Sequence, residues 1–151
     1  MSDVLKLILV LALTVGPVQS AEPINDIAEF ERRALDCFKD KEKVEKCFRQ
    51  SIKPHLSPSI ADSDSESLAS KIQPIFIQMS GSDQIYSIHK AKHKVIEGLF
   101  DDRAYAIELT TDGAFILLEM SFISIKGKWY IHKFNISNRD ESFKSTLDVG
   151  W

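Results

Sequence analysis

From Gln84 to Ser137, apolar and polar residues alternate along the chain, and two short turn signals interrupt the alternation. Asp112-Gly113 is typical of a two-residue hairpin turn, and Ile125-Lys126-Gly127 of a three-residue loop that ends in a left-handed glycine. Because side chains alternate between the two faces of a strand, each turn determines which residues share a face. The pattern predicts a four-stranded antiparallel meander, in which consecutive strands are neighbours.

The two turns predict registers that can be compared, because both involve the strand that contains Met120. The first turn places Tyr105 opposite Met120. The second turn places Met120 opposite His132 and leaves Tyr130 on the same face. The two registers agree on one apolar face, which helices must cover. The other apolar residues of that face are Ile107, Leu109, Ile116, Leu118, Phe122, Phe134 and Ile136.

Two helices are predicted ahead of the meander, because apolar residues recur at helical spacing over residues 27–38 and again over residues 44–52. Asp26 followed by Glu29 resembles a capping box at the start of the first helix. Pro54 ends the second helix. The fold class that follows is α+β, with N-terminal helices packed on one face of a four-stranded antiparallel meander sheet.

A third helix is predicted over residues 68–79, after an acidic, serine-rich loop over residues 54–67. Ser63 and Glu66, at the end of that loop, could cap it. Pro74 interrupts the helical pattern, so the helix is kinked there, or else it stops and a short strand begins at Pro74. We favour the helix.

Cys37 and Cys47 are the only cysteines of the chain, and an even pair in an oxidising compartment usually forms a disulfide. One continuous helix over residues 26–52 would hold them about 15 Å apart, whereas a disulfide needs Cα atoms within about 7 Å. A bridge therefore requires a turn between the cysteines, and Lys39-Asp40-Lys41-Glu42 is the polar place for it. The alternative is one long helix with two separate buried thiols.

Residues 1–20 resemble a cleavable secretory signal peptide, with an apolar run over Leu5–Val15 and small residues at the end. That run has about eleven residues, whereas a membrane-spanning helix needs about 20, so cleavage after Ser20 is favoured over an anchor and no stable membrane insertion is expected. A single α+β domain is predicted over residues 21–137, followed by a C-terminal tail over residues 138–151. We expect the mature protein to be periplasmic or secreted.

Charge and the second sheet face bear on the partners of the protein. The chain has 19 basic and 22 acidic residues, a net charge of −3, which argues against nucleic acid as a partner.

The sheet face opposite the helices is predicted to carry both apolar and charged residues. Such a face is typical of a homodimer interface centred on Trp129 or of a partner site, or else of scattered surface residues. Its predicted members are Phe115, Leu117, Ile123, Trp129 and Ile131, beside Glu108, Glu119 and Lys133.

The order of elements over residues 25–137 and the closing strand Gly127-Lys128-Trp129-Tyr130-Ile131-His132-Lys133-Phe134 resemble the nuclear transport factor 2-like group and the related cystatin-like arrangement. The resemblance implies a curved sheet and a helix-lined cone that can hold a small apolar ligand. Many members of this group are non-catalytic, so the resemblance is compatible with a protein that is not an enzyme. No family motif matches residue by residue, so no catalytic residues carry over.

The predicted row of Tyr105, Met120 and His132, with Tyr130 on the same face, is where polar groups converge inside an apolar wall. Such convergence is typical of a small-ligand pocket, so these four are the candidate ligand-binding residues. The alternative is that they are core side chains whose polar tips reach the backbone or the rim. Tyr105 and His132 could also form the acid–base pair of a small isomerase or dehydratase.

No other motif indicates chemistry. His89 and His93 would share a strand face about 13 Å apart, too far for one metal ion, and no cofactor motif is present. Which face of the strand over residues 84–97 points inward is left open. The leading hypothesis is an exported, non-catalytic binding module for a protein partner or a small apolar ligand, with a periplasmic immunity or inhibitor protein as one form of it.

Overall fold

The computed structural model describes residues 21–111 and 113–138. The predicted signal peptide, Asp112 of the first turn, and the predicted tail beyond Asn138 lie outside the described residues. The helices are α1 (Ile27–Asp36), α2 (Val44–Ser51) and α3 (Asp62–Ser80), with short 3₁₀ turns at Lys41–Lys43 and Lys53–His55. The strands are β1 (Ile85–Ile96), β2 (Phe100–Leu109), β3 (Phe115–Ile125) and β4 (Lys128–Ser137).

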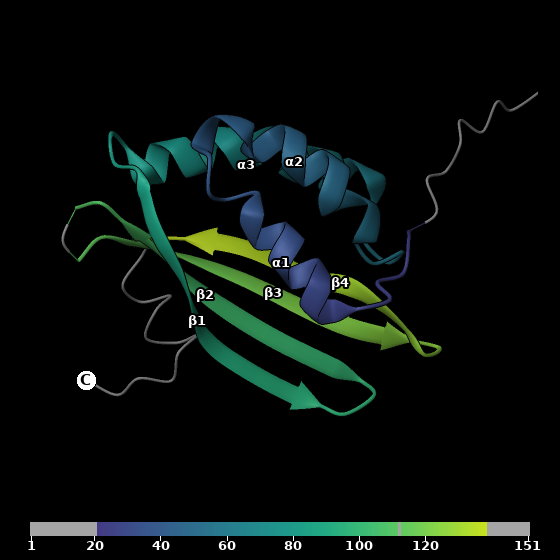
Figure 1. Ribbon diagram of the computed structural model, residues 1–151. Coiled ribbons are helices and arrows are strands. Elements are labelled where there is room, and N and C mark those ends of the chain that lie inside the picture. The colour runs from purple at the N-terminus through teal and green to yellow at the C-terminus, as the bar shows by residue number, and fades with distance from the viewer. Residues whose placement is uncertain (1–20, 112, 139–151) are drawn as a thin grey trace, which may run out of the picture.

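The four strands form one antiparallel sheet in the order β1-β2-β3-β4, and the three helices lie on the same side of it (Figure 1). The predicted α+β class and the predicted meander are therefore confirmed. The predicted apolar face of the sheet is confirmed except at Tyr130 and His132, since its other residues belong to the core or pack against it. Phe30 of α1 meets Phe122 of β3 edge to face, with ring centroids 5.8 Å apart.

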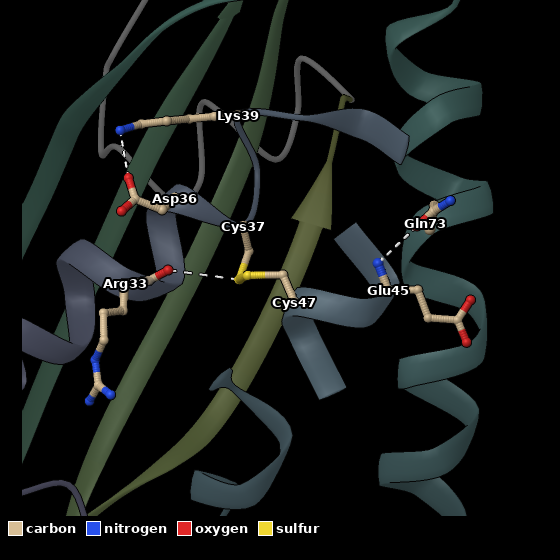
Figure 2. Close-up of a disulfide and its surroundings, with 7 residues drawn as sticks. All are labelled: Arg33, Asp36, Cys37, Lys39, Glu45, Cys47 and Gln73. Carbon is tan, nitrogen blue, oxygen red and sulfur yellow. Dashed lines mark hydrogen bonds and ion pairs between the residues drawn. A yellow bond between two sulfur atoms is a disulfide. The ribbon is translucent and has the colours of Figure 1, made fainter. Parts of the chain in front are cut away.

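The first two helices form the predicted disulfide-bonded hairpin (Figure 2). Cys37 and Cys47 are bridged with their Cα atoms 5.3 Å apart, because the chain turns between α1 and α2 over the predicted polar segment. At the start of α1, a side-chain oxygen of Asp26 accepts a hydrogen bond from the backbone N–H of Glu29. This is the capping contact that the two residues predicted.

The third helix is longer than predicted, because it begins at Asp62. Residues 62–67 are thus its first turns rather than the end of a loop, and Ser63 does not cap it. Acidic residues in the first turn of a helix are stabilised by the helix dipole, which is how this acidic segment becomes helical. Pro74 does not end the helix. Pro74 and Ser70 are both exposed, so the carbonyl that loses its helical N–H donor can bind water.

The register between β2 and β3 differs from the prediction by two residues. Tyr105 lies opposite Leu118 rather than Met120, because the strands are joined by a longer connection: the backbone N–H of Leu109 donates to the carbonyl of Ala114. A shift of two residues keeps every side chain on its predicted face. The apolar face was therefore predicted correctly even though the pairing across it was not.

The register between β3 and β4 departs from the prediction at two places, and the two departures of one residue add up to a shift of two residues. The turn has two residues rather than three, with Lys126 and Gly127 both at positive φ. This one-residue change turns Trp129 and Ile131 inward and Tyr130 outward, so the predicted faces of these three residues were wrong. A bulge at His132 then restores the predicted facing for the rest of β4.

Candidate functional site

The four predicted ligand-binding residues do not form one row. Tyr105 and Met120 are fully buried in the core, but Met120 lies opposite Phe134 on β4 and not opposite His132. His132 is the extra residue of the bulge and is exposed, and Tyr130 lies on the face away from the helices. The convergence that suggested a pocket depended on the register, and the bulge removes it.

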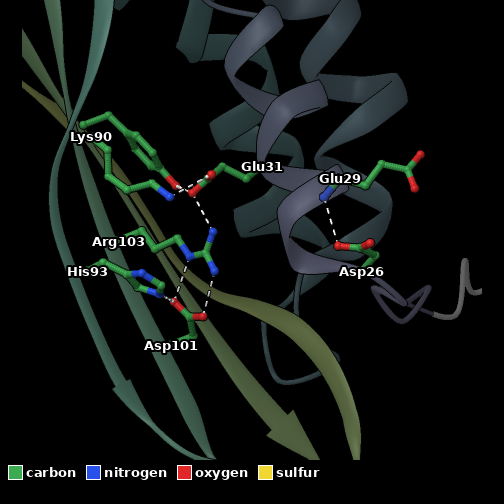
Figure 3. Close-up of polar contacts among 8 residues, drawn as sticks. Asp26, Glu29, Glu31, Lys90, His93, Asp101 and Arg103 are labelled. Carbon is green, nitrogen blue, oxygen red and sulfur yellow. Dashed lines mark hydrogen bonds and ion pairs between the residues drawn. The ribbon is translucent and has the colours of Figure 1, made fainter.

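A different set of polar residues converges between α1 and the inner faces of β1 and β2 (Figure 3). At its centre is Glu31 of α1, whose carboxylate accepts hydrogen bonds from the Tyr105 hydroxyl and, at 2.6 Å, from Nη1 of Arg103. The ammonium of Lys90 lies 3.0 Å from the same carboxylate. Three strand residues therefore hold one helix carboxylate against the sheet.

The second half of this cluster is built around Asp101, two residues before Arg103 on β2. Nε and Nη2 of Arg103 donate to the two carboxylate oxygens of Asp101 at 2.9 and 3.0 Å. Nε2 of His93 lies 3.0 Å from the same carboxylate. The Arg103 guanidinium also lies over the Phe122 ring, 5.9 Å from its centroid. We call Glu31, Lys90, His93, Asp101, Arg103 and Tyr105 the polar cluster.

The electrostatics of the polar cluster shift the pKa values of Glu31, Asp101 and Tyr105 away from neutrality. Burial by itself would raise the pKa of Glu31, but hydrogen bonds from Tyr105 and Arg103 outweigh it, and the pKa is lowered. Asp101 behaves in the same way beside Arg103. Burial and then the Glu31 carboxylate raise the pKa of Tyr105 far above its ordinary value.

This arrangement is a poor basis for acid–base chemistry at neutral pH, because a general acid or base works best with a pKa near the working pH. Glu31 and Asp101 are shifted away from neutrality on the acid side, and Tyr105 on the basic side. Within the described residues, no buried side-chain nitrogen or oxygen lacks a hydrogen-bond partner. The polar cluster therefore fastens α1 to the sheet.

The sequence carried a signal for this cluster that the prediction missed. Asp101 and Arg103 are an even number of residues away from Tyr105 and Ile107 on the same strand. They should therefore share the inner face to which Tyr105 and Ile107 were assigned. Two charged residues at inward positions indicate a buried ion pair, since buried charges are almost always paired. Glu31 gave no such signal, because it lies on a helix far away in the sequence.

His89 and His93 lie on opposite faces of the sheet, which corrects the prediction that they share one. A bulge at Ala91 separates them, so His93 joins the polar cluster while Nε2 of His89 lies 2.7 Å from Oε2 of Glu108 on the other face. Among the described residues, no group of His, Cys, Asp and Glu could hold a metal ion.

None of the described helices is long and apolar enough to span a membrane.

The two edges of the sheet differ in how they are covered. At the β4 edge, the backbone N–H of Ile24 donates to the carbonyl of Trp129 at 2.8 Å, and that of Ser57 donates to the carbonyl of Ile131 at 2.7 Å. At the other edge, β1 pairs only with β2 within the described part of the chain. Within the described residues, no segment pairs with the outer edge of β1, and we call this edge uncovered.

The end of the sheet formed by the β1–β2 and β3–β4 turns is apolar and exposed. Side chains there are 53–59% exposed at three positions of the β1–β2 hairpin and 36% exposed at Ile125. The two turns are neighbours, because the backbone N–H of Ser124 donates to the carbonyl of Leu99 at 2.9 Å. We call Val95, Ile96, Leu99 and Ile125 the sheet-end surface.

No protein-family model matches the sequence, and a search of curated proteins finds no similar sequence either. The features on which a function can be proposed are therefore those of the structure itself: a saturated polar cluster, one uncovered sheet edge and one exposed apolar end.

Proposed function

We propose that the protein is an exported, non-catalytic binding protein that recognises a protein partner through the edge of β1. The observation that carries the proposal is the contrast between the two sheet edges: segments of the chain itself cover β4 at Trp129 and Ile131, whereas β1 has no such cover among the described residues. An uncovered edge is a template for an added strand. The Cys37–Cys47 disulfide supports an oxidising, exported location.

The charge of β1 indicates what kind of strand it would accept. Lys90, Lys92 and Lys94 lie on it, and β1 contains no acidic residue. Lys90 and Lys92 are paired with Glu31 and Asp102, but Lys94 is exposed and has no ion-pair partner among the described residues. Edge lysines disfavour pairing between two copies of the chain, because like charges would face each other. An extended partner segment with carboxylates opposite Lys94 would be favoured.

The other candidate functions have lost their structural support. The isomerase or dehydratase hypothesis needs Tyr105 and His132 together, but one is fully buried and the other is exposed at a bulge. The same separation removes the reason for a small apolar ligand at that row. A homodimer centred on Trp129 is not proposed, because Trp129 packs against the core.

An immunity or inhibitor function is the form of protein recognition that we propose first, since a small, disulfide-bonded protein suits it. The order of elements, three helices and then a four-stranded meander, also supports the proposal that the chain is nuclear transport factor 2-like or cystatin-like. Both proposals leave the β1 edge as the contact surface.

The test uses the exported protein as bait for exported proteins of the source organism, followed by purification of the protein it captures. Binding of that purified partner is then measured for the wild type, for Lys94→Glu and for Lys71→Glu, which changes an exposed lysine on α3. We expect Lys94→Glu to weaken binding at least tenfold and Lys71→Glu to leave it unchanged. We also expect the partner to slow amide hydrogen exchange at residues 92–96. A partner that binds both variants equally and leaves this exchange unchanged would refute recognition through β1.

A further inference from the structure

Exposed large apolar side chains are concentrated at one end of the sheet. Four of the seven in the described residues form the sheet-end surface, Val95, Ile96, Leu99 and Ile125. Two turns that are far apart in the sequence contribute them, and the hydrogen bond from Ser124 to Leu99 keeps those turns together. Exposed apolar side chains that gather at one end of a domain indicate a site of interaction with a protein or a membrane.

The β1–β2 hairpin is apolar on both of its faces at this end. Val95 lies opposite Asp101 and therefore faces the helix side, whereas Ile96 lies opposite Phe100 and faces the other side. In Figure 1 the hairpin extends past α1, so its end is not covered by a helix. A partner that packs on one sheet face would leave half of these side chains in water. An occupant that surrounds the hairpin end would cover both faces.

Lysines frame the sheet-end surface. Lys94, Lys126 and Lys128 are exposed, and none of them has an ion-pair partner among the described residues. Glu97 is the one acidic residue within the two turns. The net charge of this frame is positive although that of the whole chain is −3, so the frame is complementary to an anionic surface.

The composition of this surface favours a lipid bilayer over a protein. Residues that dominate protein interfaces are Trp, Tyr and Arg, whereas Leu and Val are under-represented there and lysine is depleted. The sheet-end surface has only aliphatic side chains, and its charges are lysines. Aliphatic side chains that enter the acyl boundary, with lysines that reach the headgroups, are typical of proteins bound at the membrane surface.

We infer that the sheet-end surface docks reversibly on an anionic lipid bilayer, with Val95, Ile96, Leu99 and Ile125 in the interface and Lys126 and Lys128 against the headgroups. Docking of this kind needs no spanning helix, and none is present among the described helices. The surface is separate from the central part of the β1 edge, so a membrane-bound molecule can still offer that edge to a protein partner.

The inference is tested by co-sedimentation of the purified exported protein with vesicles of phosphatidylcholine alone and of phosphatidylcholine with about a third phosphatidylglycerol. We expect partition into the anionic vesicles to be at least tenfold greater and to fall with added salt. The double change Ile96→Ser and Leu99→Ser should reduce it at least tenfold, and Lys126→Glu with Lys128→Glu should do the same. The matched control is Tyr86→Ser with Phe115→Ser, which removes exposed aromatics from the opposite end of the sheet.

Equal partition of the sheet-end variant and its control would overturn the inference, and so would wild-type protein that sediments with neither vesicle. If the sheet-end change instead abolishes binding of the purified protein partner and leaves vesicle binding unaltered, the surface is a protein interface and the inference is wrong. The vesicle outcomes do not bear on the β1 edge, because that proposal is tested with the purified protein partner in solution. Loss of partner binding in the sheet-end variant would mean that the partner also contacts the end of β1, since Ile96 belongs to that strand. Circular dichroism of each variant verifies that it is folded.

Discussion

Replacing Arg103 with methionine tests whether the polar cluster fastens α1 to the sheet. The methionine keeps most of the aliphatic stem beside Phe122 but removes the guanidinium that donates to both Glu31 and Asp101. The side chains of Glu31 and Asp101 are 14% and 8% exposed, so two carboxylates would be left largely buried without their main donor. We expect the folded state to be strongly destabilised at neutral pH.

The size of the loss follows from what remains around the two carboxylates. Removing one partner of a buried ion pair costs about 3–5 kcal/mol. Lys90 still lies 3.0 Å from Glu31, and His93 still lies 3.0 Å from Asp101, so we expect the low end, about 3 kcal/mol. For a domain of this size, that corresponds to a fall in melting temperature of about 10–15 °C.

The loss of stability caused by Arg103→Met should be larger at neutral pH than at low pH. The folded-state pKa values of Glu31 and Asp101 are lowered. Burial would raise both, but hydrogen bonds from Tyr105, Arg103 and Lys90 outweigh it at Glu31, and the hydrogen bond and charge of Arg103 are the largest opposing causes at Asp101. Their contribution to stability is therefore complete above their unfolded pKa values, 4.5 and 3.8, and is lost as the pH falls through the lower folded values. Without Arg103 this gain is reduced, most of all at Asp101, so the difference in stability between wild type and variant should narrow below about pH 4.

The assay is urea unfolding followed by circular dichroism at pH 7 and at pH 3. Arg49→Met is the matched control, because Arg49 pairs with Glu45 and Glu66 on the surface, where water and salt screen ion pairs. It should shift the unfolding midpoint far less than Arg103→Met. The removal of a buried partner should cost several times more than about 1 kcal/mol. A fall of less than about 1 kcal/mol in the free energy of unfolding of Arg103→Met would therefore refute the reasoning. A loss of equal size at both pH values would refute it too.

Three further changes test local features of the fold by the same unfolding assay. Cys37→Ser with Cys47→Ser opens a bridge that spans ten residues of sequence and should cost about 3 kcal/mol; an unchanged midpoint would show that the bridge contributes nothing. Gly127→Ala places a side chain at φ 78° and should cost about 1 kcal/mol through backbone strain alone, because no atom lies within 4 Å of the new Cβ. Asp26→Ala removes the cap from the N–H of Glu29 and should cost about 1 kcal/mol, whereas Asp26→Asn should retain most of the stability.

Much of the fold could be predicted because it depends on patterns that are local in the sequence. A disulfide between Cys37 and Cys47 predicted a turn between two helices, since such a bridge cannot span ten residues of continuous helix. The inner face of the sheet followed from alternation alone, and an error of two residues in register left it unchanged. Acidic residues near Asp62 were assigned to a loop because their favourable interaction with a helix dipole appears only once the helix exists.

The candidate site was predicted less well, because it depends on how strands are joined and where they bulge. A two-residue turn at Lys126 and Gly127 and a bulge at His132 decide which β4 side chains face the core. Each of the two moves the side chains that follow it to the opposite face of the sheet. The predicted row from Tyr105 to His132 therefore does not exist, although both residues lie on strands that were predicted correctly.

The sequence by itself determined the order of the elements, the disulfide and the apolar face of the sheet, because periodicity and residue type carry that information over short stretches of chain. Only the tertiary structure decided that Glu31, Lys90 and Arg103 meet, because their contact requires α1 to lie across β1 and β2. It also decided which sheet edge is covered and which turns adjoin. These features follow from the packing of segments distant in sequence, and no local pattern encodes them.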